Sequence, residues 1–317
     1  MKNKSLVLLS GEGTTIPKAE TESLFRSYDP ASSFRAVSAR VLIVTSTADP
    51  REIGSRIAFA RRVGRLVEDK AEAAELLLGH RVRFRCFDFR RGHAPDPEEY
   101  LAGIDSPIDL RNPEYELTLV RGEEDYLAVT APTTMRQSWS SRRPRSRPFF
   151  HPSAIFPKLS RALVNLSGCK EGEVFLDPFS GTGSIPIEAH IVGARVVAMD
   201  QAERMTRGCV SNMEHFGQDW LGVVRADSTL PPLSTVDAIA TDIPYGRASS
   251  TRGRAPRELL GLLLPPLAGI LKPGSRLVLM HPQEVPVGEP DGFSLDEEHH
   301  LHVHKLLTRT ISVLRRR

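Results

Sequence analysis

Two short acidic segments in the second half of the chain carry the residue types that chemistry on a flat, polar group requires. The first, Thr241-Asp-Ile-Pro-Tyr-Gly246, directly follows an uncharged run that predicts a buried strand. Asp242 offers an acceptor for an amino group, and the Tyr245 ring can stack on a base. Pro244 stiffens the backbone between them. The alternative is an ordinary strand-to-loop exit, in which Asp, Pro and Gly only form a turn.

The second segment is a glycine-rich loop between a predicted strand and a predicted helix. The run Val174-Phe-Leu176 leads into Asp177-Pro-Phe-Ser-Gly-Thr-Gly-Ser184, and a helix is expected over 185–191. Glycines at such a junction let a ligand approach the backbone closely. The loop matches neither the P-loop nor a complete GxGxxG pattern. We expect it to supply the cofactor contacts Asp177, Pro178, Ser180, Gly181, Thr182 and Gly183.

Further acidic residues follow the next two predicted strands. Asp200 ends the strand 194–199, about 20 residues after the glycines, where an acidic side chain can accept both ribose hydroxyls of a nucleotide. Asp227 comes just after the short strand 221–225 and can accept from an adenine amino group. Together with Asp242, these acids predict a site for a cofactor that contains a nucleoside.

The second half of the chain alternates predicted strands and helices. Helices are expected over 157–165, 185–191, 202–216 and 257–270, and each of the last three lies between two strand-like runs. Such alternation is typical of a doubly wound parallel sheet, that is, a Rossmann-like α/β domain. The closing runs 299–305 and 308–314 have no helix between them, so we expect an antiparallel terminal hairpin.

The first half has a different pattern. Its opening order of strand, helix, strand, strand and helix predicts a small ferredoxin-like α+β unit, with the second helix starting at Asp49-Pro50 and continuing to Ala60. A helix is expected over 70–78, a strand over 81–89, and a hairpin from the runs 114–121 and 125–130.

Arginines gather where a polyanion could bind. In the strand 81–89, basic and apolar residues alternate, which places Arg83 and Arg85 on one face. The stretch 136–147 has no acidic residue and reads as a basic, semi-extended linker. We expect phosphate contacts from Arg83, Arg85, Arg136, Arg142, Arg143, Arg145, Arg147 and Arg247. The alternative for each group is a merely solvated face.

Length and composition limit the class of protein. The 317 residues predict two domains, and 40% hydrophobic with 26% charged residues is typical of a globular chain. No apolar run reaches the roughly 18 residues that span a membrane, and the first residues lack a secretory pattern, so we expect a cytoplasmic protein. The three cysteines are far apart, which favours neither a disulfide framework nor a metal site. No oligomeric state follows from these patterns.

The first half resembles the THUMP domain, an RNA-binding module of tRNA-modifying enzymes. The resemblance rests on Ile108-Asp-Leu-Arg-Asn-Pro113, the hairpin that follows it and the arginine-rich strand before it, and it covers roughly residues 45–135. It implies tRNA as the partner. The expected organisation is therefore an RNA-binding region over 1–135, a linker over 136–147 and a second domain over 148–317.

The second half resembles the class I S-adenosylmethionine-dependent methyltransferases. Residues 177–183 look like their cofactor loop, and Asp242-Ile-Pro-Tyr245 resembles the Asp/Asn-Pro-Pro-Tyr motif of enzymes that methylate exocyclic amino groups. The blocks 148–153, 162–166, 212–217 and 240–246 are similar to the archaeal tRNA guanine-N2 methyltransferases that act at guanosine 10. One residue departs from that pattern, because Ile243 stands where the family usually has proline.

The resemblance implies methyl transfer from S-adenosylmethionine to N2 of a guanosine in tRNA, once or twice. Asp242 would accept the amino proton, the backbone around Pro244 would be a second acceptor, and Tyr245 would stack on the base. One alternative is an enzyme for another base amine, such as guanine N2 elsewhere in tRNA or ribosomal RNA, or adenine N6. Another is a non-catalytic RNA-binding protein that retains a degenerate methyltransferase fold.

Overall fold

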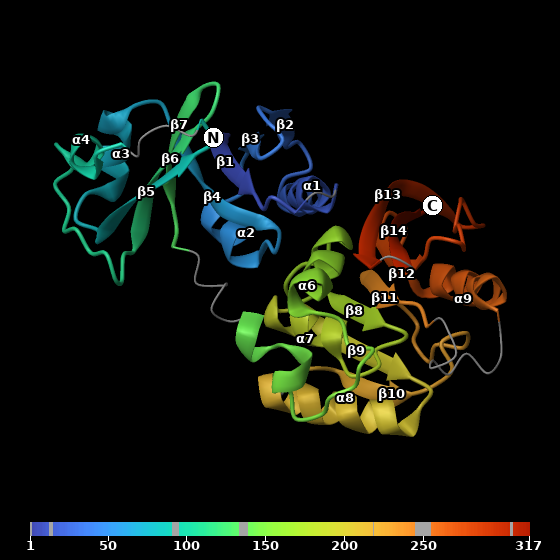
Figure 1. The fold of residues 1–317 in the computed structure, drawn as a ribbon. Helices are drawn as coiled ribbons and strands as arrows, with labels where there is room; N and C mark the ends of the chain where they lie inside the picture. The colour runs from blue at the N-terminus through green and yellow to red at the C-terminus, as the bar shows by residue number, and fades with distance from the viewer. Residues whose placement is uncertain are drawn as a thin grey trace. The chain divides into compact units, whose positions relative to one another are not determined.

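The computed structural model describes residues 2–12, 15–90, 95–132, 139–217, 219–244, 255–304 and 307–317. Packing divides the chain into two units (Figure 1). Unit 1 comprises residues 1–12 and 24–136, and unit 2 comprises residues 13–23 and 137–317. None of the helices within the described residues is long and apolar enough to cross a membrane.

Unit 1 begins with the ferredoxin-like order that the sequence predicts. Its elements are β1 (Asn3–Leu9), α1 (Ile16–Tyr28), β2 (Ser33–Ala36), β3 (Val41–Ser46), α2 (Pro50–Arg56) and β4 (Ala60–Val67). In the division by packing, the residues of α1 up to Ser23 are counted with unit 2. The four strands lie in the antiparallel order β2-β3-β1-β4, which places the core residues of β1 and β3 at the centre.

The same sheet continues into the second part of unit 1. The elements there are α3 (Lys70–Leu77), β5 (Val82–Asp88), α4 (Pro97–Leu101), β6 (Tyr115–Arg121) and β7 (Asp125–Thr130). The strand order extends as β4-β7-β6-β5, with β6 and β7 as the predicted antiparallel hairpin and β5 parallel to β6.

The predicted helix from Asp49 to Ala60 is wrong in its second half. Asp49 does cap α2, accepting from the Arg51 amide at 2.8 Å, but the helix ends at Arg56. The chain then enters β4, which pairs with β1 on one side and β7 on the other. The arginines and the glycine interrupt the alternation of apolar and polar residues in β4, whose sequence is Ala-Arg-Arg-Val-Gly-Arg-Leu-Val67. The segment is nevertheless a strand because its pairing with β1 and β7 outweighs the local pattern.

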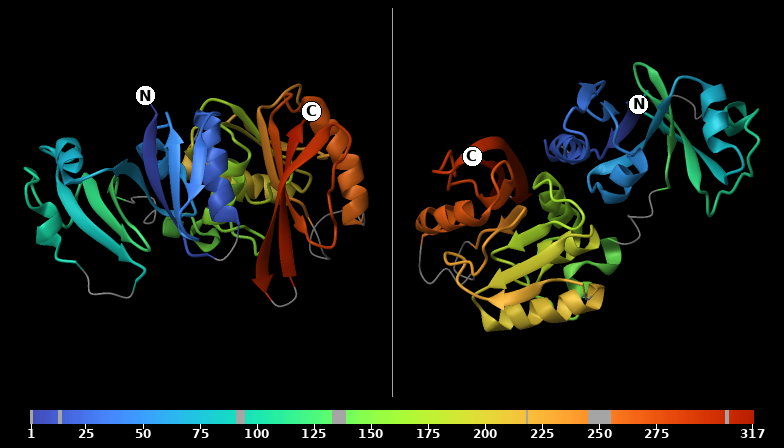
Figure 2. Two further views of the ribbon diagram at one scale, coloured as in Figure 1. Left: turned by 90° about the horizontal axis from the view of Figure 1, so that it is seen from above. Right: turned by 180° about the vertical axis from the view of Figure 1, so that it is seen from behind.

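Unit 2 has the predicted alternation of strands and helices. Its regular elements among the described residues are the 3-10 turn 144–146, α6 (Pro157–Leu166), β8 (Val174–Asp177), α7 (Ser184–Ile191), β9 (Arg195–Asp200), α8 (Glu203–Phe216), β10 (Gly222–Arg225), β11 (Ala238–Asp242), α9 (Pro256–Ile270), β12 (Arg276–Pro282), β13 (Phe293–His304) and β14 (Leu307–Arg316). The closing hairpin is longer than the sequence predicts, and Figure 2 shows β13 and β14 as a long red pair.

The sheet of unit 2 has the order β10-β9-β8-β11-β12-β14-β13. The five strands from β10 to β12 are parallel, and β14 and β13 join them antiparallel. The chain order reverses between β8 and β11, so the carboxyl ends of these two strands flank a topological switch point. In open α/β sheets, ligands bind at such a crevice.

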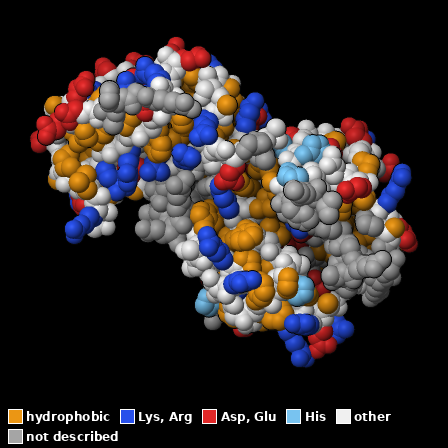
Figure 3. Space-filling model, viewed as in Figure 1, with side chains coloured by type: hydrophobic (Ala, Val, Ile, Leu, Met, Phe, Trp, Pro, Cys, Tyr) orange, Lys and Arg blue, Asp and Glu red, His pale blue; other side chains and the backbone are white. Residues whose placement is uncertain are grey.

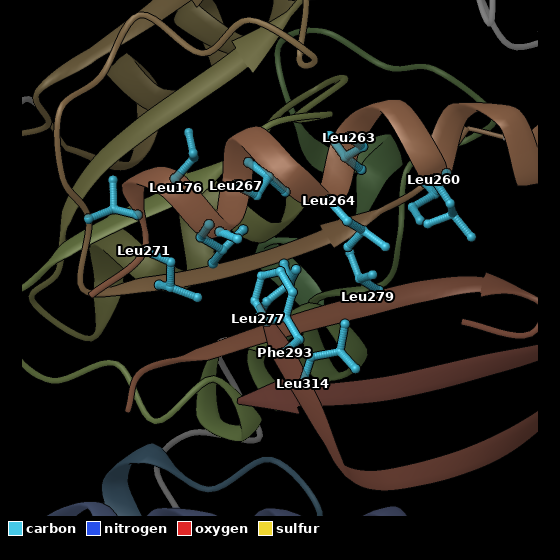
Figure 4. Close-up of a cluster of buried hydrophobic side chains, with 14 of the residues drawn as sticks. Leu176, Leu260, Leu263, Leu264, Leu267, Leu271, Leu277, Leu279, Phe293 and Leu314 are labelled. Carbon is cyan, nitrogen blue, oxygen red and sulfur yellow. The ribbon is translucent and has the colours of Figure 1, made fainter. Parts of the chain in front are cut away.

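One face of this sheet is covered by α9. Leu260, Leu263 and Leu267 of α9 are buried against the strands, in a cluster that includes Leu277 and Phe293 (Figure 4). The helix α6 contacts α7, β11 and β12, and the strand residues that alternate with this cluster are buried as well. Burial on both faces fixes the register of β8 and β11, and therefore the positions of the side chains at their ends.

The close pairing of β4 and β7 generates a stability prediction. A Cβ atom at Gly64 would lie 2.3 Å from the Val129 carbonyl oxygen, so Gly64→Ala must shift the strand backbone. We expect a loss of about 1–3 kcal/mol in the free energy of unfolding. A Cβ at Gly54, in α2, meets Val63 at an ordinary 3.5 Å, so Gly54→Ala is the matched control and should be neutral or stabilising. Equal stability of the two variants in denaturant unfolding would contradict the packing described.

Candidate active site

The carboxyl ends of β8 and β11 bring two acidic residues together. Asp177 ends β8 and is 1% exposed, and its Oδ1 accepts from the Thr241 hydroxyl at 2.6 Å and from the Phe179 amide at 3.1 Å. The pKa of Asp177 is raised to about 7, chiefly because the carboxyl is buried; the hydrogen bonds from Thr241 and Phe179 oppose this rise, and the charges of Asp242 and Asp200 add to it. Asp177 therefore holds the base of the glycine loop to the end of β11.

The glycine loop is fixed by its own backbone. The Ser180 amide donates to the Met199 carbonyl at 2.7 Å, and the Gly183 amide donates to the Ser180 carbonyl at 2.8 Å. Gly183 has φ of 85° and lies at the N-terminus of α7, where a Cβ would be 2.9 Å from Cys209 Sγ. Gly181 has φ of 51°, and a Cβ there would meet nothing within 4 Å. Gly183 is therefore needed for packing against α8, whereas Gly181 faces open space.

Asp200 connects this loop to β9. Its Oδ2 accepts from the Gly181 amide at 3.1 Å, and its Oδ1 accepts from the Ala202 amide at 2.8 Å. The carboxylate is half-buried, and burial raises its pKa. Asp227 lies one strand further, beyond β10, where its Oδ1 accepts from the amide and hydroxyl of Thr229. The structure thus brings Gly181 and Asp200 into direct contact, and Ala226, which precedes Asp227, donates its amide to the Asp200 carbonyl at 3.2 Å.

Asp242, at the end of β11, has one engaged and one available oxygen. Arg309 of β14 donates by Nη1 to Asp242 Oδ2 at 3.2 Å. Oδ1 is buried and has no hydrogen-bond partner among the described residues. Burial raises the pKa of the Asp242 carboxyl to about 7, and the Arg309 charge opposes this rise. The carboxylate therefore presents one unsatisfied acceptor atom at the switch point.

Ile243 is accommodated by its surroundings. Its amide donates to the Met280 carbonyl at 2.9 Å, which adds one bond to the β11–β12 ladder. Its side chain is 1% exposed within the core under α9. A proline has no amide hydrogen and could not make this bond. Pro244 follows and is half-buried, while Tyr245 lies outside the described residues.

Arg142 and Arg147, two of the expected phosphate contacts, are buried rather than exposed on a semi-extended linker. Arg142 Nε donates to Glu188 Oε1 at 2.7 Å, and Arg161 Nη2 lies 2.8 Å from the other oxygen of the same buried carboxylate. Arg147 donates to the Ser184 hydroxyl at 2.7 Å, and burial lowers its pKa to about 10. The prediction that these two residues are solvated is therefore wrong, because Glu188 provides a buried counter-charge. Glu188 lies 41 or more residues away in the chain, so the local sequence does not reveal it.

The remaining predicted phosphate contacts fall into three groups. Arg143 and Arg145 are exposed, and the Arg145 guanidinium lies 5.8 Å from the centre of the Phe150 ring. In unit 1, Arg83 and Arg85 both pair with the buried carboxylate of Glu116. Arg136 and Arg247 lie outside the described residues.

Two residues that support the site are given no role by the sequence, although Asn212 lies in one of the family-like blocks. Arg309 lies 67 residues from Asp242 in the chain, and no local pattern links the two. Asn212 is buried in α8, where its side chain accepts from the Phe149 amide and donates to the carbonyls of Phe149 and Thr182. A buried asparagine on an amphipathic helix is a usable signal, because such a group needs polar partners.

The residues of the loop fit S-adenosylmethionine. Each Asp200 oxygen accepts one amide and retains a lone pair for a ribose hydroxyl. Gly181 leaves open space beside the backbone, and the buried Thr182 hydroxyl has no partner among the described residues. Within the described ranges, no group of three or more His, Cys, Asp or Glu side chains could hold a metal ion.

This strand order, glycine turn and set of strand-end acids define a class I S-adenosylmethionine-dependent methyltransferase. A family model described as an RMKL-like methyltransferase domain matches residues 144–288. The chain is 31% identical to the tRNA (guanine(10)-N2)-dimethyltransferase of Methanothermobacter thermautotrophicus, over 98% of this chain and 99% of the relative. The chain belongs to the tRNA (guanine(10)-N2)-dimethyltransferase family.

A second relative agrees with this assignment, and a solved structure shares the fold. The tRNA (guanine(10)-N2)-dimethyltransferase of Methanocaldococcus jannaschii is 29% identical, with 78% of this chain and 72% of the relative covered. The crystal structure of TrmN from Thermus thermophilus superposes with a TM-score of 0.53 at 21% identity, over 99% of this chain and 100% of that one. At this identity the likeness shows the shared fold.

The raised pKa of Asp177 predicts a pH dependence of stability. Because the folded-state pKa is about 7 and the ordinary value is 3.8, the folded chain binds more protons than the unfolded chain between these values. The contribution of Asp177 to stability is therefore present at pH 4 and is lost as the pH rises to 7. Asp177→Asn cannot ionise, so its Tm relative to the wild type should rise from pH 4 to pH 7 and level off above.

The measurement is a series of thermal unfolding curves of both proteins across this range. Asp296→Asn is the control, since Asp296 is a partly exposed carboxylate that pairs with Arg315. A Tm difference between Asp177→Asn and the wild type that stays constant from pH 4 to pH 7 would contradict the buried position of this carboxyl.

Proposed function

We propose that the chain transfers methyl groups from S-adenosylmethionine to the N2 amino group of guanosine in tRNA, at position 10, and that it can do so twice. The observation that carries this proposal is the unsatisfied Oδ1 atom of Asp242 at the switch point. The names of the relatives support guanine N2 over adenine N6 as the target. A tRNA substrate favours a location in the cytoplasm, where translation uses tRNA.

The chemistry of the amine explains why an acceptor is needed. The lone pair of guanine N2 is delocalised into the ring, so the nitrogen is a weak nucleophile. As N2 forms its bond to the methyl carbon, the nitrogen becomes positively charged and its N–H groups become stronger donors. Asp242 Oδ1 accepts one of these hydrogen bonds and takes the proton that leaves N2.

When bound, S-adenosylmethionine supplies an electrophilic methyl group on a positively charged sulfur. The role of the protein is then to bind and orient both substrates. Asp200 and the loop around Gly181 would hold the nucleoside part of the cofactor. The backbone at Pro244 would give a second acceptor for the amine, and Tyr245 would stack on the extruded base. A second methylation needs the same acceptor, because monomethylated N2 retains one N–H.

Replacement of Asp242 tests this function. In Asp242→Ala the acceptor is absent, so we expect the single-turnover rate of methyl transfer to tRNA to fall by at least about 100-fold. The affinity for S-adenosylmethionine, measured by calorimetric titration, should stay within a few-fold because Asp200 and the glycine loop are intact. Asp296→Asn again serves as the control and should transfer methyl groups at the wild-type rate. Full activity of Asp242→Ala would contradict the role of this carboxylate.

We further propose that residues 1–135 form the tRNA-binding region, with a THUMP-like module over roughly 45–135. Glu116 is buried, with no exposed side-chain surface, and pairs with Arg62, Arg83 and Arg85, so the cluster carries an excess of two positive charges. The exposed fraction rises along the cluster from 10% for Arg62 to 47% for Arg85. Figure 3 shows basic side chains gathered on unit 1. Phosphate groups are natural ligands of such fixed guanidinium groups.

The exposed member of this cluster carries the test. We expect Arg85→Ala to weaken tRNA binding and to lower the slope of log K against log salt by about 1, because one phosphate contact is lost. Lys70→Ala is the matched control, since Lys70 lies in the same unit and donates to the Glu99 carbonyl. Binding curves at several salt concentrations measure both variants. An unchanged slope for Arg85→Ala would remove this strand from the RNA surface.

A further inference from the structure

The contact between Arg309 and Asp242 reaches across the sheet to the terminal hairpin. The residue Arg309 lies near the start of β14, in register with Pro282 of β12 and Leu301 of β13. Its Nη1 is 3.2 Å from Asp242 Oδ2 and 3.8 Å from Met280 Sδ. Met280 is itself the register partner of Asp242 on β12. The guanidinium therefore spans the strand that separates β14 from the end of β11.

The two side chains form a covered pair. They are 18% and 17% exposed, so solvent screens their attraction less than that of a surface ion pair. The contact engages one Asp242 oxygen and leaves the other buried and without a described partner. The two oxygens of Asp242 are therefore not equivalent, because Oδ2 is held by the guanidinium and Oδ1 keeps its full capacity to accept a hydrogen bond.

We propose that Arg309 is a positioning residue for methyl transfer, which holds Asp242 by Oδ2 in its ionised form and so directs Oδ1 to the amino group of the substrate. This role rests on the proposed function of Asp242. It adds to the site a residue that lies beyond the 144–288 range of the family model. Arg309 acts through Asp242 and has no assigned contact with the substrate.

The other charged groups around Asp242 cannot replace Arg309. On β8, Asp177 is an acid whose interaction with Asp242 disfavours ionisation of the pair. On β12, the ring of His281 is bonded to Ser312 and to the Pro282 carbonyl, and burial lowers its pKa, which favours the neutral ring. On α6, which contacts β11 and β12, Arg161 is paired with Glu188. Among the described residues, Arg309 is the basic group whose charge lowers the pKa of Asp242.

The pH dependence of the reaction separates this role from a merely structural one. Because the acceptor must be ionised, the rate of methyl transfer should rise with pH through the pKa of Asp242, which is about 7. An opposite charge within hydrogen-bond distance lowers a carboxyl pKa by about 1–3 units. In Arg309→Met, we expect the acidic midpoint of the rate profile to move up by about 1 unit or more, so that activity lost at pH 7 is recovered towards pH 9.

The experiment measures single-turnover methyl transfer to tRNA by the full chain over a range of about pH 5.5 to about pH 9.5. This range includes the rate midpoints expected for the wild type and for Arg309→Met. Arg309→Lys keeps the charge, so its midpoint should stay near that of the wild type even if its rate is lower. Arg315→Met is the matched control on the same strand, because Arg315 pairs with the more exposed Asp296 and is distant from the site in register. Its profile should equal that of the wild type.

Three outcomes would overturn the proposal: an unshifted midpoint in Arg309→Met, a rate loss that is equal at all pH values, or the same shift in Arg309→Lys as in Arg309→Met. If the wild type itself transferred no label to tRNA, the proposed function would fail instead. A wild type that transfers label while Arg309→Met keeps its midpoint would contradict the role of Arg309 alone.

Discussion

The hydrogen bond from the Thr241 hydroxyl to Asp177 is the interaction on which the site depends. It joins the ends of β8 and β11 at 2.6 Å, at the point where the strand order of the sheet reverses. From this point the chain continues from β8 into the glycine loop and α7, and β11 ends one residue later at Asp242. A single buried carboxylate thus couples the backbone that would hold a cofactor to the backbone that would hold a substrate.

Burial and charge are balanced differently at the two acids. Both carboxyl groups have their pKa raised to about 7, in each case chiefly because the group is withdrawn from water. Asp177 is satisfied by a hydroxyl and an amide, as a structural group should be. Asp242 has instead a guanidinium on one oxygen and no described partner on the other. The contrast is consistent with a structural role for Asp177 and with the acceptor role that we propose for Asp242.

The sequence predicts the parts of the site that lie on one continuous stretch. The glycine loop, Asp200 and Asp242 are recognisable because each follows a buried strand, and parallel strands place such ends at one edge of a sheet. Arg309 could not be found in this way, since its contact depends on the pairing of β14 with β12. The burial of Arg142 and Arg147 likewise depends on Glu188, a partner in a later helix. Long-range partners decide whether an arginine faces solvent or the core.

Ile243 shows how a departure from a motif can be compensated by packing. A proline would restrict φ by its ring, whereas Ile243 is held by an amide bond to Met280 and by a side chain buried in the core. The proline ring of the family motif and the contacts of Ile243 both restrict the backbone directly after Asp242. The sequence alone exposes the loss of the ring, but the gain of a ladder bond is visible only when β11 and β12 are paired.

Methyl transfer to guanine N2 is tested most directly by changing the substrate rather than the protein. A tRNA transcript with guanosine at position 10 is compared with the same transcript carrying inosine there, which lacks the exocyclic amine and is otherwise the same base. Transfer of labelled methyl groups by the wild-type chain is measured for both. We expect label on the guanosine transcript and none on the inosine transcript. Equal labelling of the two would contradict N2 of this guanosine as the acceptor.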